Sequence, residues 1–350
     1  MVPEASDLCG NVDVWIPAWA ENFALPKRRA AVLSLAMKAF TRFAWSVLAY
    51  VLAVIAWGAV VRASGSGAGC GERWPTCNGQ VLPSSPSVAT VIEFTHRAMS
   101  GLALALVITL AVVAWRAVPP GHGVRKAAGF SLLFMLLEAL LGAGLVLFGW
   151  VAKDASAARG WAMALHLINT FLLLGSLTLT AALGERPKSG VRNLGWVLPA
   201  VFAAASALAI LAGITGAAAA LGDTLFPSVS FAQGLRQEFE GGAHLLLRLR
   251  LVHPFAAMAC AVAMVAAAHL GAQGVPDRPV RSAARALAVL VALQLASGVL
   301  NLVLLAPVWL QILHLVLADL AWIALVLLGV TVFSPAPVRE PAQAPDFGMA

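Results

Sequence analysis

Long apolar stretches alternate with short polar stretches along most of the chain. Each apolar stretch has about 20 residues, enough for an α-helix to cross roughly 30 Å of hydrocarbon. A helix also satisfies its own backbone hydrogen bonds, which a segment inside a membrane requires. The pattern therefore predicts an all-α polytopic membrane protein with eight spans, at 41–61, 89–115, 125–149, 160–183, 193–216, 246–270, 281–305 and 308–332.

Composition excludes the main alternatives to a membrane protein. Of 350 residues, 61% are hydrophobic and only 11% are charged, with a mean hydropathy of +0.87. Soluble globular, disordered, fibrous and disulfide-framework chains have other compositions. The formal net charge is +7, but the cations lie in the gaps between apolar stretches rather than on one face. We therefore expect contact with membrane lipid and no nucleic-acid partner.

The cations also predict an orientation in the membrane. With a cytoplasmic N-terminus, 15 of the 23 Lys and Arg residues fall on the inside, 7 fall on the outside and Arg97 lies within the second span. The positive-inside rule then predicts cytoplasmic N- and C-termini. We expect 1–40 to be a cytoplasmic extension and the Pro-rich 334–350 to be a disordered cytoplasmic tail.

The two halves of the chain share a pattern of polar residues. The matching residues lie 148 to 157 positions apart, and the pairs are Trp161 with Trp309, His166 with His314, Glu138 with Gln294, Gly142 with Gly298, and His96 with His253. Four spans in each half let both halves enter from the same side of the membrane. This predicts a parallel repeat of two four-helix bundles, at 41–190 and 191–333.

Four histidines lie at one depth in the even-numbered spans: His96, His166, His253 and His314. An imidazole in hydrocarbon is costly unless it is paired or ligated, and a hydrogen bond across a helix interface could explain any single one. Two pairs at matching depth favour a ligand instead. Zinc or a di-iron centre would need further Cys or carboxylate ligands. A haem with two axial imidazoles needs only the pair, so the pattern predicts one haem site in each half.

The residues one helical turn before two of these histidines differ in charge. Glu93 precedes His96, whereas Arg250, close to Arg248, precedes His253. Glu93 could relay protons or stabilise positive charge, and the two arginines could neutralise haem propionates. The alternatives are an exposed position at the end of the span for Glu93 and anchoring at the membrane interface for the arginines.

The first outer loop contains Cys70 and Cys77 in a glycine-rich sequence. A loop on the oxidising side favours either a disulfide or a dithiol that exchanges with a partner, and the spacing does not decide between them. A zinc site would need two more ligands nearby, and the sequence around the loop offers none.

These features together resemble the haem A synthases of respiratory bacteria and mitochondria. The motifs that carry the resemblance are Gly58-Ala-Val-Val-Arg62, Ser64-Gly-Ser-Gly67, Cys70 to Cys77 with Trp74-Pro75, Glu93-Phe-Thr-His96-Arg97, Leu165-His166, Leu249-Arg-Leu-Val-His253-Pro254 and Leu313-His314. The resemblance covers about 43–333. It implies an enzyme of the bacterial cytoplasmic membrane that oxidises the C8 methyl of haem O to a formyl group, giving haem A for cytochrome oxidase.

The resemblance also implies roles for individual residues. His96 and His166 would hold the substrate haem O, His253 and His314 a resident haem b, and Glu93 would be catalytic. Cys70 and Cys77 match the family's first cysteine pair. The implied partners are haem O synthase, a quinol or thiol protein as electron donor, and cytochrome oxidase assembly factors, with a homo-oligomer left open.

The chain departs from the family pattern in two places, and other functions stay open. The loop between the fifth and sixth spans lacks the second cysteine pair of some bacterial members. Pro254 follows His253 at a position where an arginine is expected, and a proline there could kink the span.

The main alternative function is that of an electron-transfer cytochrome with two permanent haems. A transporter is a further alternative. A haem farnesyltransferase is disfavoured because the chain has no Asp-x-x-x-Asp pair.

Overall fold

A computed structural model describes residues 27–185, 195–240 and 242–334. Within these ranges the protein is all α-helical, with a single isolated bridge between Cys77 and Gln80. The helices are α2 (Lys27–Ala63), α3 (Val88–Ala117), α4 (Gly123–Leu147), α5 (Ala157–Gly184), α6 (Val197–Leu225), α7 (Phe231–Phe239), α8 (Leu245–Gly274), α9 (Arg278–Val303) and α10 (Val308–Phe333), with a short 3-10 helix at Ser66–Ala68.

Eight of these helices, all except α7, are long and apolar enough to cross a membrane. The predicted all-α polytopic membrane protein is therefore confirmed. Two elements differ from the prediction. Helix α2 begins at Lys27, so part of the expected N-terminal extension continues into the first span, and α7 is a short helix in the loop between two spans. The predictions for 1–26 and 335–350 lie outside the described residues.

Short polar side chains begin several of the helices. The hydroxyls of Ser87, Ser156 and Ser230 accept hydrogen bonds from backbone N–H groups in the first turns of α3, α5 and α7. Such N-caps satisfy donors that the helix itself leaves unpaired. Pro254 lies inside α8, yet α8 is a single helix from Leu245 to Gly274 and the proline is exposed.

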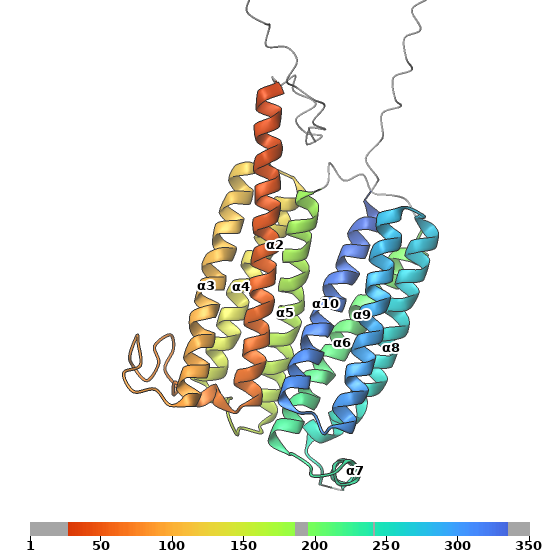
Figure 1. Ribbon diagram of the computed structural model, residues 1–350. Helices are drawn as coiled ribbons and strands as arrows, with labels where there is room; N and C mark the ends of the chain where they lie inside the picture. Colours follow the sequence, from red (N-terminus) through yellow and green to blue (C-terminus); the bar gives the residue numbers. More distant parts are fainter. Residues whose placement is uncertain (1–26, 186–194, 241, 335–350) are drawn as a thin grey trace, which may run out of the picture.

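The spans form two groups of four (Figure 1). Helices α2 to α5 pack on one another, and so do α6, α8, α9 and α10. The two groups meet where α5 and α2 contact α10 and α6. Their relation as a parallel repeat stays a prediction.

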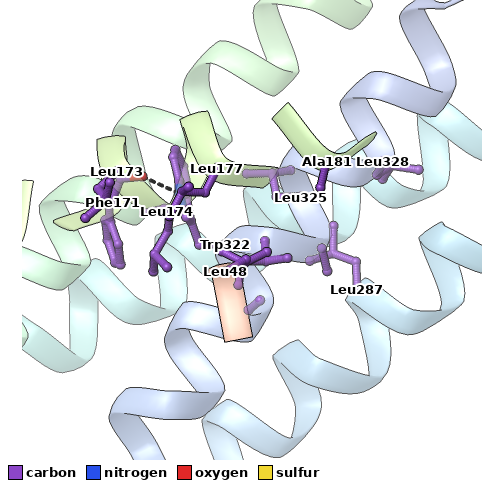
Figure 2. Packing of buried hydrophobic residues seen from close by; sticks show 14 of the residues in the cluster. Leu48, Phe171, Leu173, Leu174, Leu177, Ala181, Leu287, Trp322, Leu325 and Leu328 are labelled. Carbon is purple, nitrogen blue, oxygen red and sulfur yellow. Dashed lines mark hydrogen bonds between the residues drawn. The ribbon is translucent and has the colours of Figure 1, made fainter. Parts of the chain in front are cut away.

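Helix α5 is the most enclosed span. In its most apolar 18-residue window 72% of the residues are buried, against 17–39% in the other spans, which expose more apolar side chains to lipid. Figure 2 shows leucines of α5 and α10 packed together where the groups meet. There the rings of Phe171 and Trp322 stack at 5.3 Å, and the Trp322 indole N–H donates to the Phe171 carbonyl at 2.8 Å. Close packing and such hydrogen bonds hold helices together in lipid.

Arg62, at the end of α2, makes a polar connection between the two groups. Its guanidinium donates to the Ala220 carbonyl at 2.7 Å, the Thr224 hydroxyl at 2.8 Å and the Gln311 side-chain oxygen at 2.8 Å. These partners lie on α6 and α10. The last turn of α2 is therefore tied to the other group of helices.

Candidate functional site

The four histidines of interest lie near one end of the molecule. His96, His166, His253 and His314 lie six to nine residues after the first residues of α3, α5, α8 and α10. At 1.5 Å per residue this is within about 14 Å of the helix starts. We call this the disulfide end, because it includes the loop with Cys70 and Cys77 between α2 and α3. All four rings are partly buried.

The rings of His253 and His314 face each other across the second group of helices. Their centroids are 6.3 Å apart and their planes are nearly perpendicular, at 87°. A metal bound to imidazole lies about 2 Å from the nitrogen. The separation is therefore wide enough for one metal atom between a nitrogen of each ring.

His253 is fixed from one side by α6. Its Nδ1 lies 3.3 Å from the Thr215 hydroxyl, and the ring also interacts with the backbone of Ala212. A metal-bound histidine is commonly oriented through its second nitrogen in this way. The contact on Nδ1 leaves Nε2 as the nitrogen for a ligand.

His314 is held by two side chains of α9. Its Nδ1 lies 2.7 Å from the Ser297 hydroxyl, and its Nε2 lies 3.2 Å from the side-chain nitrogen of Gln294. With the Nδ1 hydrogen donated to Ser297, Nε2 accepts from the Gln294 amide. The Gln294 amide thus occupies the Nε2 lone pair that an iron would bind. The amide must therefore move away before a metal can bind His314.

The first group of helices holds the second pair, His96 on α3 and His166 on α5. Within the described residues neither Nδ1 atom has a hydrogen-bond partner. A buried polar atom without a partner is costly, so it is a good indicator of a missing ligand or contact.

Glu138 of α4 is a site residue that sequence reasoning noted only as part of the repeat. Its Oε1 lies 3.5 Å from His166 Nδ1, and its carboxylate accepts hydrogen bonds from Asn169 at 2.5 Å and Thr170 at 2.6 Å. A carboxylate beside a histidine orients the ring and raises its basicity as a ligand. The signal in the sequence was its position in the predicted repeat, where it matches Gln294. In the structure Gln294 contacts His314.

Glycines lie against three of the four rings. A Cβ added at Gly58 would be 3.0 Å from His96 Cε1, at Gly216 2.9 Å from His253 Cε1, and at Gly298 3.2 Å from His314 Cε1. Any side chain would therefore push on the ring. The glycines let each histidine lie directly against the neighbouring helix.

Substitution of these glycines should disturb ligand binding. We expect Gly216→Ala and Gly298→Ala to displace their imidazoles and to weaken haem binding by about tenfold, the lower range for lost orienting contacts. The ratio of haem to protein and the haem absorption spectrum would measure this.

Gly142, the counterpart of Gly298 in the repeat, provides the control. A Cβ there would meet nothing within 4 Å, so Gly142→Ala should leave the spectrum unchanged. Equal haem content in all three variants would show that the glycines have no part in placing the rings.

Glu93 is buried, with 3% of its surface exposed. The alternative of an exposed position at the end of the span is therefore wrong. Its Oε1 accepts from Arg97 at 2.5 Å, and its Oε2 accepts from the backbone N–H of Cys70 at 2.7 Å. The carboxylate thus connects the helix of His96 with the cysteine loop.

Cys70 and Cys77 form a disulfide in this structure, with an S–S distance of 2.02 Å. Arg97 also holds this loop, because its Nη1 donates to the carbonyl oxygens of Arg73 at 2.7 Å and Thr76 at 2.8 Å. Glu93 and Arg97 together dock the loop on α3. The loop is therefore part of the same structural unit as the His96 site.

Gly69 makes the closest approach between this loop and α3. Its carbonyl accepts from the Thr90 hydroxyl at 2.8 Å, and a Cβ at this position would lie 2.4 Å from the backbone of Ala89. We expect Gly69→Ala to lower the free energy of unfolding by about 1 to 3 kcal/mol, as overpacking commonly does. Thermal unfolding in detergent would measure the loss.

Gly101, an exposed position in α3 with nothing within 4 Å of an added Cβ, is the matched control. Alanine is the better helix former there, so Gly101→Ala should not destabilise the protein. If Gly69→Ala behaved like this control, the loop would not be docked as described.

Arg250 is already engaged by protein groups. Its Nη1 lies 2.8 Å from Asp223 of α6, its Nε donates to Glu238 of α7, and its Nη2 donates to the Gly234 carbonyl at 3.2 Å. These contacts attach α7 to the ends of α6 and α8. Arg248 is exposed. A role of the two arginines with propionates stays a prediction, and Arg250 would have to exchange partners to take it.

The chain is similar to several known proteins. Residues 41–326 match the model of the COX15-CtaA family, described as a cytochrome oxidase assembly protein. A protein of Halalkalibacterium halodurans named heme A synthase is 38% identical over 152 residues, which are 43% of this chain and 50% of that protein. One of Shouchella clausii with the same name is 46% identical over 99 residues, 28% of this chain and 33% of that protein.

A longer match has a different name. A protein of Thermus thermophilus named protoheme IX farnesyltransferase is 47% identical over 289 residues, 82% of this chain and 47% of that protein. The chain thus spans about half the length of the curated relatives it matches, and more than half of the Thermus protein lies outside the match. Because the family model covers most of the spans, from α2 to α10, the chain belongs to the COX15-CtaA family of cytochrome oxidase assembly proteins.

Proposed function

We propose that the protein is a haem A synthase, which oxidises the C8 methyl group of haem O to a formyl group to supply haem A to cytochrome oxidase. The observation that carries the proposal is the pair of facing imidazoles, His253 and His314, 6.3 Å apart, together with His96 and His166 at the same end of the first group of helices. Family membership and the relatives named heme A synthase support it.

The described residues fit haem as a ligand. Each group of helices offers two imidazoles, and within the described residues no three His, Cys, Asp or Glu side chains cluster as a metal site. This donor set suits axial ligation of a porphyrin iron rather than a bare metal ion. The glycines against the rings and the unpartnered Nδ1 atom of His96 support the same assignment.

The two groups of helices take different roles in this proposal. His96 and His166 in 41–190 hold haem O as substrate, and His253 and His314 in 191–333 hold a resident haem b. When bound, the haem b supplies one-electron redox chemistry, which side chains alone cannot provide for an unactivated methyl group.

The protein residues position these groups. Glu138 orients His166, as Ser297 orients His314 through its Nδ1. Glu93 and Arg97 hold the disulfide loop on the first turns of α3. Glu93 is also the carboxylate within one helical turn of His96, and we assign it the catalytic proton-handling role.

The orientation and the partners follow from the same proposal. Both termini face the cytoplasm, and the histidines lie near the outer surface of the bacterial cytoplasmic membrane. Haem O synthase delivers the substrate, a quinol or a thiol protein supplies electrons, and cytochrome oxidase assembly factors receive the product.

Pigment extraction tests the proposed activity. The full chain is produced in cells together with a haem O source, purified, and its haems are extracted and separated by chromatography. A synthase yields haem A or its hydroxylated precursor beside haem b. Haem b alone would replace the proposal with a two-haem electron-transfer cytochrome. Formation of haem O in cells without another source would support a farnesyltransferase, and colourless protein would favour a transporter.

A further inference from the structure

Asp319 is an acidic residue in the interior of the membrane-spanning region. It lies on α10, five residues beyond His314 and thus about 7 to 8 Å further from the disulfide end. Only 1% of its surface is exposed. Trp322, one turn further along α10, stacks on Phe171 of α5, which places this part of α10 at the contact between the two groups of helices.

The carboxyl group of Asp319 has no cation to compensate it. Within the described part of the chain neither of its oxygens has a hydrogen-bond partner, and none of the ion pairs includes it.

A buried carboxyl group without donors is costly as an anion. A carboxylate in such a place costs several kcal/mol. A neutral carboxylic acid avoids this cost. Ionisable residues inside membranes are rare and commonly mark functional sites.

We propose that Asp319 is a proton-binding site inside the membrane, held as a neutral carboxylic acid. The proton then lies on α10 close to the contact between the two groups of helices. This inference does not depend on the proposed synthase activity.

Infrared spectroscopy of the purified full chain tests the proton directly. In a detergent without ester groups, the wild-type protein should show the carbonyl stretch of a protonated carboxyl group, which shifts in D2O. Asp319→Asn should lose the equivalent of one such group per protein. The control Asp154→Asn removes a carboxylate that accepts hydrogen bonds from Ser156 near a span end, and it should not change the band.

If Asp319→Asn fails to fold, isotope labelling of aspartate in the wild-type protein can identify the protonated carboxyl band without a substitution. An unlabelled-minus-labelled spectrum without a protonated carboxyl band would overturn the proposal.

Discussion

Replacing His253 with alanine is expected to remove haem b from the purified protein, and His314→Ala should do the same. The two rings face each other at 6.3 Å, so neither alone can provide two axial ligands. We expect a protein that still inserts in the membrane but lacks the haem b absorption bands. Haem extraction with chromatography and reduced-minus-oxidised spectra would measure the loss.

His269→Ala is the matched control, because His269 lies on the same helix near its other end and is exposed. This variant should keep its haem b. Unchanged haem b in both His253→Ala and His314→Ala would rule out the assignment of the resident haem to the second group of helices.

Changing Glu93 to alanine is expected to stop haem A production while haem b stays bound. The substitution leaves the partly buried Arg97 without its carboxylate, and removing one partner of such an ion pair is destabilising. It also removes the acceptor for the Cys70 N–H, so the loop should detach from α3. Haem A formed per protein and haem b content, measured on the same preparation, would separate the two effects.

Glu72→Ala controls for loss of a carboxylate from the loop itself, since Glu72 is exposed. It should retain both haem b and activity. Full activity in Glu93→Ala would reduce Glu93 to a structural residue, and loss of haem b in that variant would show that its effect reaches the other group of helices.

The arrangement of spans could be predicted from the sequence because hydrocarbon imposes a length and a composition on every span. The sequence did not reveal where α2 begins, since charged residues such as Lys38 and Arg42 interrupt the apolar pattern without ending the helix. Helix α7 was missed for a related reason. A helix of nine residues leaves little hydropathy signal, and this one depends on Glu238 and Gly234 contacting Arg250.

Helical geometry predicts the depth of the candidate site residues in the membrane. Depth follows from counting residues along each span, so the four histidines could be placed on one level. Which helix faces meet does not follow from counting. The contacts of Gly216 with His253, Gln294 with His314 and Glu93 with the Cys70 backbone depend on helix rotation and on loop docking, which sequence separation does not encode.

Arg62 has a consequence for substitutions at the end of α2. Its single guanidinium donates to acceptors on both α6 and α10. A neutral residue at this position would remove all three hydrogen bonds at once, so each acceptor would lose this partner. The polar contact between the two groups of helices at this end of α2 therefore depends on one side chain.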